Sequence, residues 1–89
     1  MMEPSMTEIR HILEKLQGAQ QPLDSVALFP DAKSGQEQAE AMQKILWLRD
    51  EGLVTFEAVE RRGAHKIPYA AAGIKIARVG LEWLKRDTA

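Results

Sequence analysis

The fold is decided by SGQEQAEAMQKILWLRDEGLVTFEAVERRGAHK, residues 34–66, together with GIKIARVGLEWL at residues 73–84. The first segment opens with Ser34 and has Glu37 three positions later, a capping box that satisfies free amides where a helix begins. Gly52 follows D-E and supplies the left-handed conformation that commonly ends a helix. These signals predict a helix from residue 34 to residue 51.

This helix has two unlike sides on a helical wheel. Its apolar side carries Ala39, Met42, Ile45 and Leu46, with Ala41 and Leu48 at the margin. Its polar side carries Gln36, Glu40, Gln43, Lys44 and Trp47. Apolar residues at helical spacing predict which side faces the core, and the polar side is left for solvent or a partner.

A β-hairpin is predicted after this helix. Residues 53–59 alternate between two faces, as a strand does, and ERRGAHK at residues 60–66 then forms a turn around Gly63. The returning strand is predicted at GIKIARV, residues 73–79, so PYAAA at residues 68–72 makes the hairpin tip long or irregular. Pro68 indicates an edge position. A short helix over VGLEWLKR, residues 79–86, closes the chain.

The N-terminal part begins with a second capping box, formed by Ser5 and Glu8. Ile9, Ile12, Leu13 and Leu16 then recur on one face, which predicts a helix over residues 6–17. Between Pro22 and Pro30, the segment LDSVALF fits either a short helix capped by Asp24 or Ser25, or an extended strand. We favour the short helix.

Composition indicates one ordinary small domain, residues 1–89. The chain has 45% hydrophobic and 28% charged residues, a formal net charge of −1 and no cysteine. Disulfides and thiolate metal sites are therefore excluded. No apolar run approaches the length that spans a bilayer, and the acidic N-terminus lacks a signal-peptide pattern. We expect a cytoplasmic protein with no membrane partner.

The predicted order of helices, hairpin and closing helix is that of an α+β winged helix-turn-helix, with three to four helices and a small antiparallel hairpin as the wing. The junction IARVGLEWL resembles the L-T-x-x-G-x-x-Y-L ending of small bacterial and phage winged-helix proteins of the YjcQ type. A capped helix ending in L-x-x-E-G-L before a hairpin is also similar. Ala77 stands where that largely uncharacterised family has threonine, so the hydroxyl cap of the last helix is missing.

The basic turn is the sharpest candidate for a functional site. Arg61, Arg62, His65 and Lys66 lie within six residues. At the tip of a wing, such cations reach the phosphates of DNA, and the planar guanidinium of arginine makes paired bonds to phosphate oxygens. The alternative is a solvated hairpin end, because exposed loops are commonly charged.

The polar side of the residue 34–51 helix is the second candidate. Gln36, Gln43 and Lys44 would approach base edges if this helix entered a major groove. Glu37, Glu40, Asp50 and Glu51 occupy the same surface and repel phosphates. The wing, not the helix, carries the positive charge.

Trp47 is the anchor of an alternative function. An indole on a polar face favours a protein interface or a homodimer seam, because tryptophan buries a large apolar area there. The other interpretation is that Trp47 packs under the wing or the closing helix.

Catalysis and metal binding are not expected. His11 and His65 are the only histidines and lack a carboxylate at metal-ligand spacing. The chain has no nucleophile elbow, phosphate loop or dinucleotide signature. We therefore expect no enzyme activity and no cofactor. The sequence favours a DNA-binding transcriptional regulator that contacts double-stranded DNA, with a protein-interaction module anchored by Trp47 as the alternative.

Overall fold

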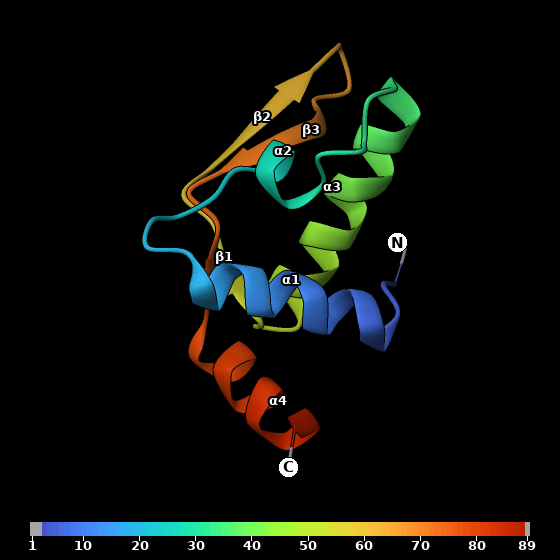
Figure 1. Cartoon of the computed structure of the whole chain (residues 1–89). Coiled ribbons are helices and arrows are strands. Elements are labelled where there is room, and N and C mark those ends of the chain that lie inside the picture. The colour runs from blue at the N-terminus through green and yellow to red at the C-terminus, as the bar shows by residue number, and fades with distance from the viewer. Residues whose placement is uncertain (1–2, 89) are drawn as a thin grey trace.

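The computed structural model describes residues 3–88, and Figure 1 shows their arrangement. In this part of the chain, four helices and two small antiparallel sheets form a compact α+β fold. In chain order the elements are α1 (Met6–Gly18), α2 (Ser25–Leu28), α3 (Gly35–Asp50), β1 (Val54–Thr55), β2 (Ala58–Arg62), β3 (Ile67–Ala72), β4 (Lys75–Ile76) and α4 (Arg78–Thr88).

Both predicted capping boxes are present. The Ser5 hydroxyl accepts from the Glu8 amide at 3.2 Å, and the Glu8 side chain accepts in return from the Ser5 amide. Ser34 and Glu37 make the same reciprocal pair at the start of α3. Gly52 ends that helix with a φ of 78°, as predicted.

The short helix favoured between Pro22 and Pro30 is also confirmed. Asp24 caps α2, because its carboxylate accepts a 2.8 Å hydrogen bond from the Ala27 amide. The preceding residue, Leu23, is extended and forms an isolated antiparallel bridge with Ile74. The segment therefore holds one strand-like contact and one turn of helix.

The predicted hairpin has the wrong boundaries. Its strands are β2 and β3, so Arg61 and Arg62 end a strand and the turn is confined to residues 63–66. The stretch expected as an irregular tip, PYAAA, is paired in β3. The predicted pairing of residues 53–59 with residues 73–79 is confirmed at β1 and β4, where Val54 pairs with Ile76 and Thr55 with Lys75. Alanine gives β3 no alternating pattern, and backbone pairing across a tight turn, which Gly63 allows, decides the structure instead.

A β-bulge lies in the middle of this hairpin. Glu60 pairs with Ala70 and Arg61 with Pro68, so Tyr69 is the extra residue on β3. Pro68 has no amide hydrogen to donate, which is why proline is tolerated at a bulge or an edge. The bulge gives Tyr69 a position that regular pairing would not provide.

The core lies where α1, α3 and the β1–β4 pair meet. Leu13, Met42, Ile45, Leu48 and Ile74 are almost wholly buried. On α3 the buried side includes Ala41 and Leu48, whereas Ala39 and Leu46 are half-buried. The apolar side is rotated from the predicted one because α3 packs against β3 of the hairpin and against β1 as well as α2.

The closing helix packs on α1 and begins one residue earlier than predicted. The carbonyl of Ala77 accepts a 3.1 Å hydrogen bond from the Leu81 amide, so a backbone group starts the helix. Gly80 allows a close approach: a Cβ at this position would lie 2.3 Å from the Leu53 carbonyl oxygen. No helix among residues 3–88 is both long and apolar enough to cross a membrane.

Candidate nucleic-acid interface

The basic residues of the hairpin gather at its tip. Arg61, Arg62, His65 and Lys66 are all exposed, and Figure 1 shows the tip at the same end of the molecule as the start of α3, with α4 at the opposite end. Arg61 donates a 3.1 Å hydrogen bond to the Lys66 carbonyl oxygen across the turn. Lys66 has a φ of 53°, so this turn holds a non-glycine residue in the left-handed region.

Tyr69 supports Arg62 from the opposite strand. The Arg62 guanidinium carbon lies 3.8 Å from the centroid of the Tyr69 ring, a cation–π contact. The Tyr69 hydroxyl donates a hydrogen bond to the Glu60 carboxylate. The ring thus holds the guanidinium on one face of the hairpin, and its own orientation is fixed by Glu60.

None of the three permanent cations at the tip takes part in the ion pairs found among the described residues. Those pairs include Glu8 with Lys44, Asp50 with Arg49, and Glu82 with Arg78. Arg61, Arg62 and Lys66 therefore keep their charge available to an anionic partner. Unpaired guanidinium and ammonium groups on a projecting hairpin suit the phosphates of a nucleic acid.

The outer face of α3 differs from the tip in charge. Gln36 and Gln43 are exposed there, but the Gln36 amide donates to the Glu40 carboxylate at 3.4 Å. Glu37, which follows Gln36 in α3, is also exposed. The structure thus keeps both predicted glutamines on the surface and places carboxylates between them.

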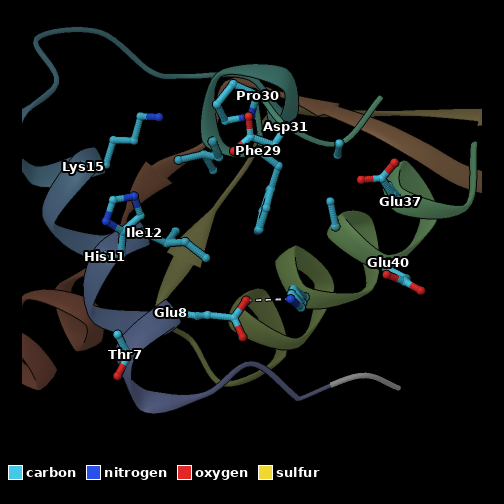
Figure 2. Close-up of a pocket in the computed structure, with 14 residues that line it drawn as sticks. Thr7, Glu8, His11, Ile12, Lys15, Phe29, Pro30, Asp31, Glu37 and Glu40 are labelled. Carbon is cyan, nitrogen blue, oxygen red and sulfur yellow. Dashed lines mark hydrogen bonds and ion pairs between the residues drawn. The ribbon is translucent and has the colours of Figure 1, made fainter. Parts of the chain in front are cut away.

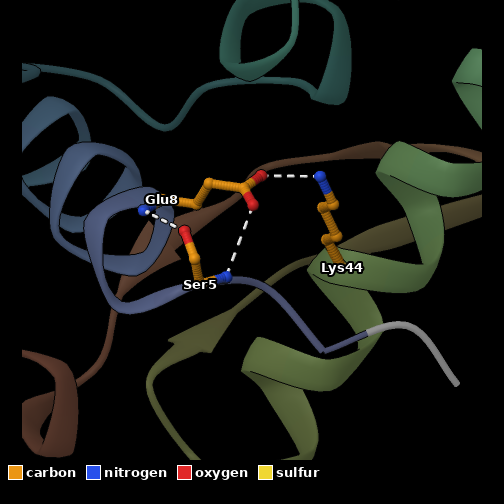
Figure 3. Close-up of polar contacts among 3 residues, drawn as sticks. All are labelled: Ser5, Glu8 and Lys44. Atoms are coloured by element: carbon orange, nitrogen blue, oxygen red, sulfur yellow. Dashed lines mark hydrogen bonds and ion pairs between the residues drawn. The ribbon is translucent and has the colours of Figure 1, made fainter.

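Lys44 lies apart from these glutamines. Its ammonium is 2.6 Å from the Glu8 carboxylate on α1, and only 22% of its side chain is exposed (Figure 3). The hydrogen bond from Lys44 lowers the pKa of Glu8 below its usual value, while partial burial acts in the opposite direction. Lys44 joins two helices in this arrangement.

Trp47 is half-buried and packs against the hydrophobic core. Trp83 on α4 is also half-buried and contacts the core. This contact with the core gives Trp47 a role in the packing of the fold.

No group of three or more potential metal-ligating side chains occurs within residues 3–88. Comparison of the chain with models of known protein families, with curated proteins and with solved structures finds no match.

Sequence reasoning missed Tyr69. It was placed in an irregular tip, where its ring would have no fixed neighbour. The signal that finds it is the register of β2 with β3, because only this pairing brings the ring under Arg62 and the hydroxyl to Glu60.

Proposed function

We propose that this chain is a winged-helix protein that binds double-stranded DNA through the phosphates, with the hairpin tip as its main contact, and that it regulates transcription. The observation that carries the proposal is the exposed group Arg61, Arg62, His65 and Lys66, whose permanent cations have no carboxylate partner among the described residues. Phosphate contacts supply most of the sequence-independent affinity for DNA.

The order of elements supports the winged-helix assignment. A long helix, α3, is followed by an antiparallel hairpin, and the extended residue Leu23 ahead of α2 bridges to Ile74 beside the β1–β4 pair. In a winged helix, the helix before the hairpin and the hairpin tip face the same partner. The resemblance of residues 76–84 to winged-helix proteins of the YjcQ type agrees with this assignment.

In this proposal, α3 contributes less to DNA binding than the recognition helix of a sequence-specific protein does. Gln36 and Gln43 remain available to base edges, but Glu37 and Glu40 repel phosphates, and Lys44 is held by Glu8. We therefore propose that affinity depends mainly on the tip and that base discrimination is weak.

The test is binding of random duplex DNA across a salt series. The test variant is Arg61→Gln/Arg62→Gln/Lys66→Asn, in which asparagine suits the left-handed backbone at position 66. The matched control, Lys75→Gln/Arg78→Gln/Arg86→Gln, removes the same charge from exposed positions in β4 and α4.

We expect log affinity of the parent to fall steeply with log salt. Each lost phosphate contact reduces this slope by about 0.9, so the test variant should lose up to about 3 units of slope. The control should keep the parental slope. Absence of binding at low salt, or equal loss in both variants, would overturn the proposal and favour a protein partner.

A further inference from the structure

A groove lies between α1, α3 and the segment that joins α2 to α3, on a surface separate from the hairpin tip. Its volume is about 520 Å³, within the range of small-molecule sites in proteins. Figure 2 shows the Phe29 side chain reaching into the space between the two helices, with Glu8 on α1 and Glu37 and Glu40 on α3. Neither the hairpin nor α4 contributes to its lining.

The groove has an apolar interior. Ile12, Leu28 and Ala41 line it and are buried, and the half-buried ring of Phe29 adds an aromatic surface. Such a lining favours an apolar body in a ligand, because burying that body removes it from water. A phenyl ring in this position also attracts a cation that reaches its face.

The charges around this interior are predominantly negative. Four carboxylates line the groove against two lysines, which leaves two negative charges in excess. Both lysines already have acceptors: Lys44 is paired with Glu8 at 2.6 Å, and Lys15 donates to the Ala27 carbonyl oxygen at 2.6 Å. The carboxylate of Glu8 balances Lys44, whereas Lys15 keeps its charge beside the carbonyl oxygen. An anionic ligand would therefore meet Asp31, Glu37 and Glu40 with only Lys15 to balance them.

We infer that this groove binds a small organic cation with an apolar body, such as an arylalkylamine. The apolar body would occupy the space against Phe29 and Ile12, and the ammonium group would lie toward Asp31 and Glu37. The inference does not depend on nucleic-acid binding, because neither the basic residues of the hairpin tip nor Gln36 and Gln43 line the groove.

The experiment compares three probes that share one apolar body and differ in charge: 4-phenylbutylamine, 4-phenylbutanol and 4-phenylbutyrate. Each is titrated into the ¹⁵N-labelled protein at pH 7, and amide shifts give both the dissociation constant and the position of the site. Exposed ion pairs favour binding by a factor of about two to five, so the amine should bind about fivefold more tightly than the carboxylate. The largest shifts should fall on residues 7–15 and 28–44.

The test variant is Asp31→Asn/Glu37→Gln, in which glutamine at position 37 preserves the capping box. The matched control, Glu14→Gln/Glu51→Gln, removes two exposed carboxylates that do not line the groove. We expect the test variant to bind the amine and the carboxylate within twofold of each other, and the control to keep the preference.

Three results would overturn the inference. These are equal affinity of the parent for amine and carboxylate, shifts confined to residues outside the groove, and absence of saturable binding of the amine up to millimolar concentration. A test variant that retains the full preference for the amine would overturn the assignment of its charge to Asp31 and Glu37.

Discussion

The carboxylate of Glu8, in the first turn of α1, lies 2.6 Å from the ammonium of Lys44, in the middle of α3. The same carboxylate group also accepts a hydrogen bond from the Ser5 amide (Figure 3). One side chain therefore completes a helix cap and joins two helices that are 36 residues apart in sequence. This relationship turns Lys44 away from the surface that carries Gln36 and Gln43.

We expect Glu8→Gln to lower the free energy of unfolding at pH 7 by up to about 1 kcal/mol, because glutamine preserves the cap but removes the ion pair. The pKa of Glu8 is lowered in the folded state by Lys44, so the ionised group stabilises the fold above its unfolded pKa of about 4.3. This contribution is lost as the pH falls through the lower folded pKa. The difference between parent and variant should therefore shrink below about pH 4.

Urea unfolding followed by circular dichroism at pH 7, 5 and 3 measures this difference. Glu14→Gln, at an exposed position on the same helix, serves as the control for removal of one surface carboxylate. A difference between parent and Glu8→Gln that grows toward low pH would contradict the assigned ion pair.

Gly80→Ala should be strongly destabilising. The added methyl group would lie 2.3 Å from the Leu53 carbonyl oxygen and 2.8 Å from Cγ1 of Ile76, so α4 would have to move from the β1–β4 pair. Overpacking of this kind costs about 1–3 kcal/mol or more. Gly35→Ala is the control, since a methyl group there meets no atom within 4 Å, and its unfolding midpoint in urea should equal or exceed that of the parent.

Ser25→Ala should cost about 1–3 kcal/mol of unfolding free energy. The Ser25 hydroxyl is buried at the start of α2 and accepts a 3.1 Å hydrogen bond from the Ala71 amide in β3. Its removal leaves a buried donor unpaired. Thermal or urea unfolding tests this, with the exposed neighbour Val26→Ala expected to change stability by less than about 0.5 kcal/mol. Equal effects of the two substitutions would show that the hydrogen bond contributes little.

Replacement of Tyr69 should separate its ring from its hydroxyl. Tyr69→Leu removes the surface that holds Arg62, and we expect duplex DNA affinity at low salt to fall about two- to fivefold, the value of an exposed cation–π contact. Tyr69→Phe keeps the ring and should bind within twofold of the parent. Fluorescence anisotropy with a labelled duplex makes the comparison. Equal affinity of all three proteins would remove Tyr69 from the proposed interface.

The sequence by itself determined the helices, because their signals are local. A capping box requires only two residues three positions apart, as at Ser5 and Ser34, and Gly52 ends α3 through its own backbone conformation. The short helix α2 was likewise identifiable from its Asp24 cap. The position of the basic tip residues near one turn also followed from the sequence alone.

Only the tertiary structure decided the hairpin register, the ion pair of Lys44 and the groove. β3 is rich in alanine and carries no alternating pattern, so its pairing with β2 depends on backbone hydrogen bonds and the bulge at Tyr69. Lys44 and Glu8 meet because α1 and α3 pack on a shared core. A helical wheel describes one helix and therefore cannot predict a contact between two. Local signals specify where an element begins and ends, and long-range packing specifies which side chains meet.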